Sequence, residues 1–162
     1  PGLTVWQNLW VARNSTEDTR AEGISSRWFR KSGPVKNEID AMLEFSGLAD
    51  KGDELASNLA FGEQRRLELA RAAATKPRLL LLDEPAAGMN QEEVRDLDRR
   101  IRELRQQGMT IILIEHVMEL VMGITDRIVV LNFGSKIAEG KPAAIRENKS
   151  VQEAYLGQSE GS

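Results

Sequence analysis

The 162-residue chain contains no cysteine and a single histidine, His116. Without cysteine there is no disulfide framework and no thiolate metal site, and one histidine excludes a zinc site built on two histidines. The G-x-S-x-G string at residues 157–161 follows a predicted helix and not the strand that a nucleophile elbow requires, so we expect no acyl-transfer triad of the hydrolase type. No apolar run approaches the roughly 18 residues that a membrane-spanning helix needs. The carboxylates and the one histidine are therefore the candidates for catalytic or metal-binding residues.

The overall composition is that of an ordinary globular protein. Hydrophobic residues make up 41% and charged residues 29%, which is enough apolar material for a core. The length suggests one domain, or one domain with a small appendage. The net charge of −3 favours neither nucleic acid nor an anionic membrane as a partner.

Four consecutive leucines, at positions 79–82, precede Asp83, Glu84 and Pro85. A short apolar run without a polar face predicts a strand buried on both sides, and proline, which cannot donate to a ladder, ends it. Ligands of open parallel sheets bind at this carboxyl end of the strands. The alternative is a buried strand that ends in a solvated acidic turn, and this stretch alone does not decide between them.

The remaining pattern predicts an α/β protein with a parallel sheet and a short antiparallel addition. Thr4 and Asn90 are the expected N-caps of two of its helices. Helices are expected at 4–13, 35–47, 62–75, 91–107, 117–123, 142–148 and 151–156, and strands at 79–84, 110–114, 127–131 and 135–140. Residues 14–34, which include Trp28 and Phe29, predict a loop with a short helix. The basic stretch 64–78 is either a phosphate-binding surface or, as we favour, a solvated helix face with ion pairs.

Two strands are each followed by a polar pair, Asp83-Glu84 and Glu115-His116. Because parallel strands end at the same edge of a sheet, these pairs are expected to share one cleft. Two acids and a histidine at such an edge suit Mg²⁺ and an activated water that attacks a phosphorus.

The order and spacing of four motifs resemble the second half of an ABC-type ATPase. These are Leu59-Ala60-Phe61-Gly62-Glu63-Gln64-Arg65-Arg66 (signature motif), residues 79–84 (Walker B), Ala86-Ala87-Gly88-Met89-Asn90 (D-loop) and His116 (switch histidine). The sequence around these motifs, including residues 131–140 and 153–157, resembles that of the ATPase subunits of branched-chain amino-acid importers.

The resemblance implies ATP and Mg²⁺ as ligands and gives roles to individual residues. Asp83 would hold Mg²⁺ through water, Glu84 would be the general base, and His116 would contact the γ-phosphate and the attacking water. The loop that couples the two active sites of a dimer would contain Ala87, Gly88 and Asn90. The segment that contacts the nucleotide held by the other subunit would be Leu59, Ala60, Phe61, Gly62 and Glu63.

The resemblance also implies an organisation and a setting. Residues 1–75 would form the helical subdomain, 76–140 the C-terminal part of a P-loop ATPase core, and 141–162 a helical extension. The partners would be a second ATPase subunit, identical or not, and transmembrane permease subunits, with no nucleic acid. The protein would be cytoplasmic, peripheral on the inner face of the cell membrane.

The chain departs from the family at two positions of the signature motif. Ala60 stands where serine is usual, which removes a hydrogen bond to a charged group, roughly 1.5–3 kcal/mol if nothing replaces it. Glu63 stands where glutamine is usual and places an anion near an anion unless it turns away.

No phosphate loop of the form G-x-x-x-x-G-K-[ST] occurs in the sequence, and the Q-loop glutamine is missing. The nearest candidate, residues 134–141, has the wrong spacing and lies in a predicted hairpin. Since the family carries both features before a start like Thr4-Val5, we expect a chain truncated at its N-terminus and inactive alone. Two alternatives are a catalytically inactive interaction module and an ABC-type ATPase outside transport.

Overall fold

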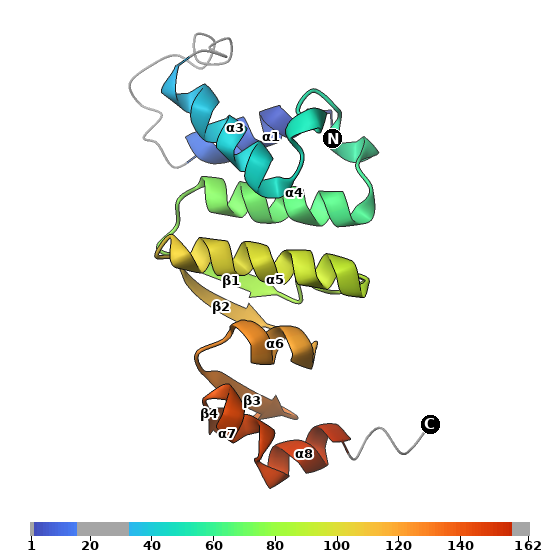
Figure 1. The fold of residues 1–162 in the computed structure, drawn as a ribbon, viewed down its shortest axis with the longest axis vertical. Coiled ribbons are helices and arrows are strands. Elements are labelled where there is room, and N and C mark those ends of the chain that lie inside the picture. Colours follow the sequence, from blue (N-terminus) through green and yellow to red (C-terminus); the bar gives the residue numbers. More distant parts are fainter. Residues whose placement is uncertain (1, 16–32, 157–162) are drawn as a thin grey trace. The chain divides into compact units, whose positions relative to one another are not determined.

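The structure is a computed structural model that describes residues 2–15 and 33–156 (Figure 1). It divides into two compact units, Pro1–Ile114 and Glu115–Ser162, and we describe each by itself. The predicted short helix within 14–34, with Trp28 and Phe29, lies outside the described residues. In the described part of the chain, no helix is both long enough and apolar enough to cross a membrane.

The first unit begins with three helices. They are α1 (Val5–Asn14), α3 (Pro34–Ser46) and α4 (Phe61–Ala74), with short 3-10 turns η1 (Ala49–Lys51) and η2 (Ala56–Asn58) between the last two. Thr4 Oγ1 accepts a hydrogen bond from Gln7 N at 3.2 Å, and Gln7 Oε1 accepts one from Thr4 N at 2.9 Å. Gly47 ends α3 with φ 64°, a left-handed conformation that glycine adopts without steric cost. The three helices pack on one another through buried side chains, chiefly Val5, Leu9, Ile39, Leu43, Leu48 and Leu67.

A parallel pair of strands follows, β1 (Leu79–Asp83) and β2 (Thr110–Ile114), connected by α5 (Gln91–Gln106). The register places Asp83 beside Ile114, so both strands end at the same edge. The expectation that the strand of consecutive leucines is buried on both sides is wrong. Leu80 is 6% exposed but its neighbour Leu81 is 67% exposed.

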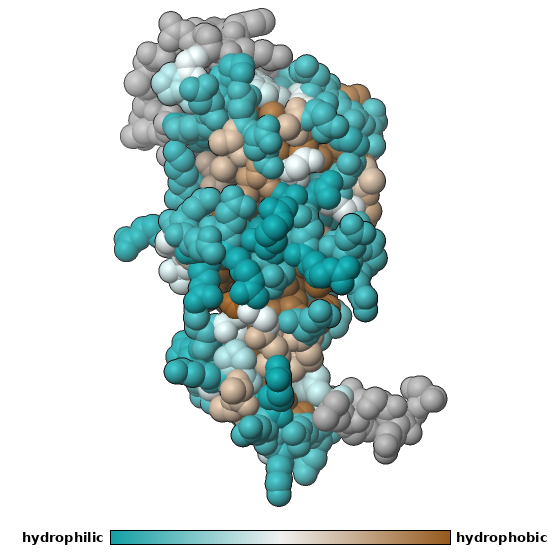
Figure 2. Space-filling model, in the orientation of Figure 1, coloured by the Kyte–Doolittle hydropathy of each residue, from teal (hydrophilic) through white to brown (hydrophobic). Residues whose placement is uncertain are grey.

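The exposed face of this sheet has a simple origin. Side chains alternate along a strand, so the side chains of one face pack toward the helices while those of the other face point away. In the described part of the unit, nothing buries that second face, which carries Leu79, Leu81, Ile112 and Ile114. Figure 2 shows hydrophobic side chains at the surface below the hydrophilic outer side of α5, where Figure 1 draws β1 and β2.

The second unit contains α6 (Met118–Ile124), the hairpin β3 (Ile128–Asn132) and β4 (Ser135–Gly140), and the helices α7 (Pro142–Arg146) and α8 (Lys149–Leu156). The hairpin turn has positive φ at both central residues, 46° at Phe133 and 78° at Gly134, as a type I′ turn requires. Its core consists of Ile128, Val130, Ile145 and Val151.

The fold class expected from the sequence, an α/β protein with a parallel sheet and a C-terminal hairpin, is confirmed. The expected boundaries after residues 75 and 140 stay predictions.

Candidate functional site

The chain turns sharply at the carboxyl end of β1. Asp83, the last residue of the strand, is exposed. Glu84 follows with φ 45°, a left-handed conformation that is rare for a residue with a side chain. Its N–H donates to the carbonyl of Ile114 at 2.8 Å, which fixes the turn against the end of β2. Backbone strain of this kind collects at functional sites, where the surrounding structure holds it in place.

Residues 85–90 form a compact loop between this turn and α5. Ala87 N donates to Glu84 O at 3.1 Å, and Met89 N donates to Ala86 O at 3.1 Å. Asn90 then caps α5: its Oδ1 accepts from the N–H groups of Glu92 and Glu93 at 2.9 and 3.0 Å. The Asn90 side-chain oxygen therefore already bonds the helix, which confirms Asn90 as its N-cap.

The 59–63 segment forms the start of α4. Ala60 occupies the N-cap position with φ −61° and ψ 157°, and it has no oxygen with which to cap the helix. Only the reciprocal half of a capping box is made, by Glu63 Oε2, which accepts from Ala60 N at 3.0 Å. The N–H groups of the first turn receive no side-chain cap. Such groups, together with the helix dipole, favour an anionic ligand at this end.

The 59–63 segment and the 85–90 loop pack directly against each other. A Cβ added at Gly88, where φ is 75°, would lie 3.3 Å from Phe61 Cε1. A Cβ added at Gly62 would lie only 2.2 Å from Glu93 Oε1. At Gly88 the positive φ favours glycine, and at Gly62 a Cβ would displace the Glu93 carboxylate. The structure brings these two predicted site segments together within the first unit.

Glu63 does not project a free charge toward the start of α4. Its carboxylate is held by Lys51 of η1, with Lys51 Nζ 2.8 Å from Oε1 and 3.0 Å from Oε2. This contact with Lys51, assisted by the Ala60 N–H and Arg66, holds the pKa of Glu63 below its ordinary value despite partial burial. The same contact raises the pKa of Lys51. The anion expected to face an anion has instead turned back and is neutralised.

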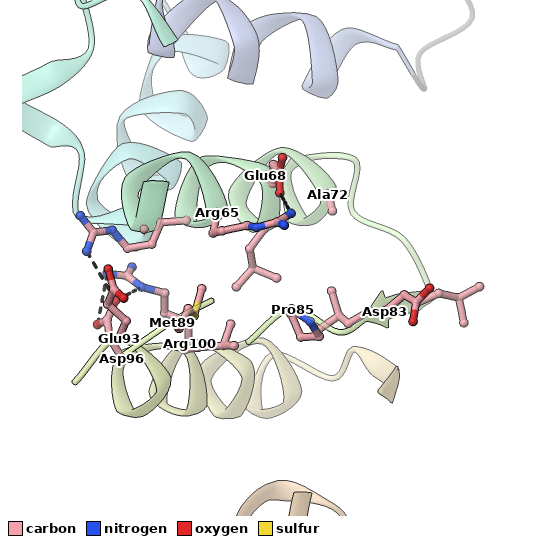
Figure 3. Close-up of a pocket in the computed structure, with 15 residues that line it drawn as sticks. Arg65, Glu68, Ala72, Asp83, Pro85, Met89, Glu93, Asp96 and Arg100 are labelled. Atoms are coloured by element: carbon pink, nitrogen blue, oxygen red, sulfur yellow. Dashed lines mark hydrogen bonds and ion pairs between the residues drawn. The ribbon is translucent and has the colours of Figure 1, made fainter. Parts of the chain in front are cut away.

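A cavity of about 160 Å³ lies between α4, β1 and α5. Figure 3 shows Asp83 at one end of it and Glu93, Asp96 and Arg100 at the other. Arg100 is 4% exposed, and its Nε donates to Asp96 Oδ2 at 2.8 Å. Burial acts to raise the pKa of Asp96, but Arg100 and Arg99 outweigh it and the pKa is lowered. The expectation that the basic stretch forms ion pairs is confirmed, since Arg65 pairs with Glu68 and Arg66 lies 4.0 Å from Asp96.

His116 belongs to the second unit and is 64% exposed at its side chain. Glu115 beside it is fully buried at its side chain, and its Oε2 accepts from the N–H groups of His116 and Val117 at 2.7 and 3.0 Å. The same oxygen lies 3.6 Å from His116 Nδ1. The expectation that His116 shares a cleft with Asp83 and Glu84 stays a prediction.

Comparisons with known proteins agree with this geometry. A family model described as "ABC transporter" matches residues 1–87, more than half of the chain. The chain belongs to the ABC transporter family. A second model, "Branched-chain amino acid ATP-binding cassette transporter", matches residues 135–161.

Several curated ABC transporter subunits are similar over nearly the whole chain. "High-affinity branched-chain amino acid transport ATP-binding protein LivG" of Escherichia coli is 45% identical over 163 residues, covering 96% of this chain and 63% of LivG. BraF of Pseudomonas aeruginosa, whose name is otherwise the same, is 44% identical with the same coverage. The solved ATP-binding cassette MJ1267 has a TM-score of 0.74 and 28% identity, covering 95% of this chain and 63% of that structure. The chain thus spans about 63% of the length of these relatives.

Sequence reasoning missed two side chains, Lys51 and Arg100, and the contacts of two others, Glu93 and Glu115. Lys51 and Arg100 make contacts across elements, and no spacing rule connects them with their neighbours. Glu93 lies three residues after the expected N-cap Asn90, and it also packs on Gly62. Glu115 was expected as a site acid, whereas its carboxylate bonds the backbone of the next two residues.

Proposed function

We propose that this chain is the C-terminal portion of the ATP-hydrolysing subunit of an ABC importer for branched-chain or related amino acids. The observation that carries the proposal is the match of residues 135–161 to the branched-chain family model, in a chain whose residues 1–87 match the ABC model. LivG and BraF, which are named as branched-chain amino acid transport proteins, support the same substrate class.

In this function, Glu84 is the general base that accepts a proton from the attacking water. It is exposed directly after β1 and has a left-handed backbone. His116 contacts the γ-phosphate from its exposed position. The uncapped first turn of α4, with Leu59, Ala60, Phe61, Gly62 and Glu63, faces the phosphates held by a second ATPase subunit. Gly88 and Asn90 belong to the loop that faces the same subunit.

Asp83 suits a Mg²⁺ ion that arrives with its nucleotide. Its carboxylate is exposed at the end of β1, and the described residues include no group of three or more acidic, histidine or cysteine side chains placed to hold a metal. Mg²⁺ is commonly bound by one or two carboxylates together with water and substrate phosphates. Asp83 would hold the ion in this way, and the bound ion would offset the negative charge of the phosphates.

A chimera tests this function. The LivG segment that precedes the matched region is joined to this chain, and phosphate release from ATP is measured together with leucine uptake in cells lacking LivG. We expect the chimera to hydrolyse ATP and restore uptake, and its Glu84→Gln variant to do neither. The 162-residue chain alone should not hydrolyse ATP, because its sequence lacks a phosphate loop.

Other outcomes would assign a different role. A folded chimera that restores neither activity would favour the interaction module, to which Ala60 also points. ATP hydrolysis without leucine uptake would favour an ABC-type ATPase outside this transport class. Hydrolysis by the chain alone, abolished by Glu84→Gln, would show that the phosphate loop is not required.

A further inference from the structure

Glu63 lies at the end of α4 where a phosphate would approach. Its Oε2 is 3.0 Å from Ala60 N, at the N-cap of the helix. A carboxylate in this position competes with a phosphate for the positive end of the helix dipole. Its charge therefore has to be offset if the first turn of α4 is to receive a second anion.

Lys51 provides that offset from a different element. It lies in η1, twelve positions before Glu63 in the chain, and its ammonium reaches both carboxylate oxygens, at 2.8 and 3.0 Å. Arg66 is more distant, with Nη2 3.8 Å from Glu63 Oε1. Glu63 is 19% exposed and Lys51 33% exposed at their side chains, so solvent only partly screens the pair.

We propose that Lys51 is a positioning residue for the nucleotide: it holds Glu63 back on Ala60 N–H and cancels its charge, so that α4 can accept a phosphate. The inference rests on the proposed function, in which the start of α4 contacts phosphates. It accounts for a glutamate where the family usually has glutamine. The acid is tolerated because a lysine accompanies it.

The test measures tripolyphosphate binding to the ¹⁵N-labelled chain from the backbone amide shifts of residues 60–63, at constant ionic strength. Four forms are compared: wild type, Lys51→Met, Glu63→Gln and the double variant. Glu63→Gln keeps an oxygen for Ala60 N–H and removes only the charge. Lys36→Met is the matched control, because Lys36 also pairs with an acid, Asp40, on another helix of the same unit.

Net charge at the site predicts the order of affinity. We expect Lys51→Met to bind about fivefold more weakly than wild type, and Glu63→Gln to bind more tightly by a similar factor. The double variant should return to within about twofold of wild type, because it restores the net charge. The Lys36→Met control should match wild type.

Thermal unfolding of every form separates this role from a purely structural one. A structural pair would change the unfolding temperature and leave the affinity of the folded forms equal, which would overturn the inference. A double variant as weak as Lys51→Met would also overturn it, since Lys51 would then act on the phosphate directly. If Lys51→Met does not fold, equal affinity of wild type and Glu63→Gln still overturns the inference. Absence of binding in every form would count against the proposed function itself.

Discussion

Glu84 is held in a backbone conformation that its residue type disfavours. The φ of 45° places it in the left-handed region, which costs an L-residue roughly 1–2 kcal/mol. The hydrogen bond to Ile114 O and the turn that follows keep it there. The backbone conformation of this one residue therefore lowers the free energy of unfolding at the position of the proposed general base, Glu84.

Replacing Glu84 by glycine should therefore stabilise the chain. We expect Glu84→Gly to raise the free energy of unfolding by about 1 kcal/mol, because glycine adopts positive φ without steric cost. Urea unfolding followed by circular dichroism measures the change. Glu84→Gln keeps the Cβ and should show no gain. In the LivG chimera both variants should lose hydrolysis. Equal stability of the two variants would contradict the strain.

We expect Gly62→Ala to lower the free energy of unfolding in the wild-type chain and to raise it in a Glu93→Ala variant. In the wild-type chain the new Cβ would meet Glu93 Oε1 at 2.2 Å. Displacing Glu93 breaks its hydrogen bond to Asn90 N, so Gly62→Ala should cost about 1 kcal/mol. In a Glu93→Ala background the same change should stabilise by up to about 1 kcal/mol, because alanine favours helix more than glycine. If urea unfolding gives equal effects in both backgrounds, Glu93 is not the cause of the cost of a Cβ at position 62.

At the scale of elements, α5 carries two arginine–aspartate pairs of identical spacing and different surroundings. Arg100 is buried, pairs with Asp96, and lies over the Phe45 ring of α3 at 5.7 Å. Arg102 pairs with Asp98 and is 45% exposed at its side chain. Arg100 therefore joins α5 to α3, whereas the pair of Arg102 with Asp98 lies within α5 and is largely exposed.

This difference predicts that alanine at position 100 lowers the free energy of unfolding more than alanine at position 102. Arg100→Ala should lower the free energy of unfolding by about 2 kcal/mol, because it removes buried packing and leaves Asp96 with weaker partners. Arg102→Ala should cost less than about 0.5 kcal/mol, as exposed pairs do. Chemical denaturation of both variants gives the comparison, and similar costs would contradict the structural distinction.

The ion pair between η1 and α4 predicts a pH dependence of stability. The pKa of Glu63 is lowered by Lys51, so the folded state favours the carboxylate, and the resulting stability is present above the unfolded pKa. It is lost as the pH falls through the lowered folded pKa. The stability difference between wild type and Glu63→Gln should be largest near neutral pH and narrow below 4.5, the ordinary value. Lys51→Met should lose the same pH-dependent part, and a difference constant with pH would contradict the pair.

The sequence predicted the elements well and their packing partly. Caps at Thr4 and Asn90, the stop at Gly47 and the stripe of Leu97, Ile101 and Leu104 on α5 are local features, and local patterns specify them. Arg100 lies one position before Ile101 and is buried as well. A polar–apolar pattern predicts that an arginine at this position is exposed. Lys51 and Glu63 pair across two elements, so no periodicity signals the contact. The predicted burial of both faces of β1 was wrong, because a run of leucines shows that the residues are apolar and does not show what covers them.

At the scale of the whole molecule, an apolar sheet face is exposed in the first unit. Leu81, at 67% exposure, and Leu80, at 6%, are neighbours on β1 with opposite environments. Exposed apolar patches mark interaction surfaces or favour association. The isolated chain should therefore self-associate through this face.

Replacing Leu81 or Leu80 with threonine distinguishes the exposed face of β1 from its buried face. Leu81→Thr should reduce self-association, measured by light scattering, and change the free energy of unfolding by less than about 0.5 kcal/mol. Leu80→Thr, the control, should cost about 3 kcal/mol, as the truncation of a buried leucine does. Comparable costs at both positions would show that Leu81 is covered in solution.

Main-chain hydrogen bonds attach the start of α1 to the connector that leads to α4. Trp6 N donates to Gly52 O at 2.9 Å, and Ala56 N donates to Leu3 O at 3.1 Å. Such bonds do not depend on side-chain identity, and only proline at a donor position would remove one. Apart from Lys51, which holds Glu63, side chains of this connector can therefore change during evolution without loss of these main-chain bonds, so that the surface changes while the backbone that supports it stays the same.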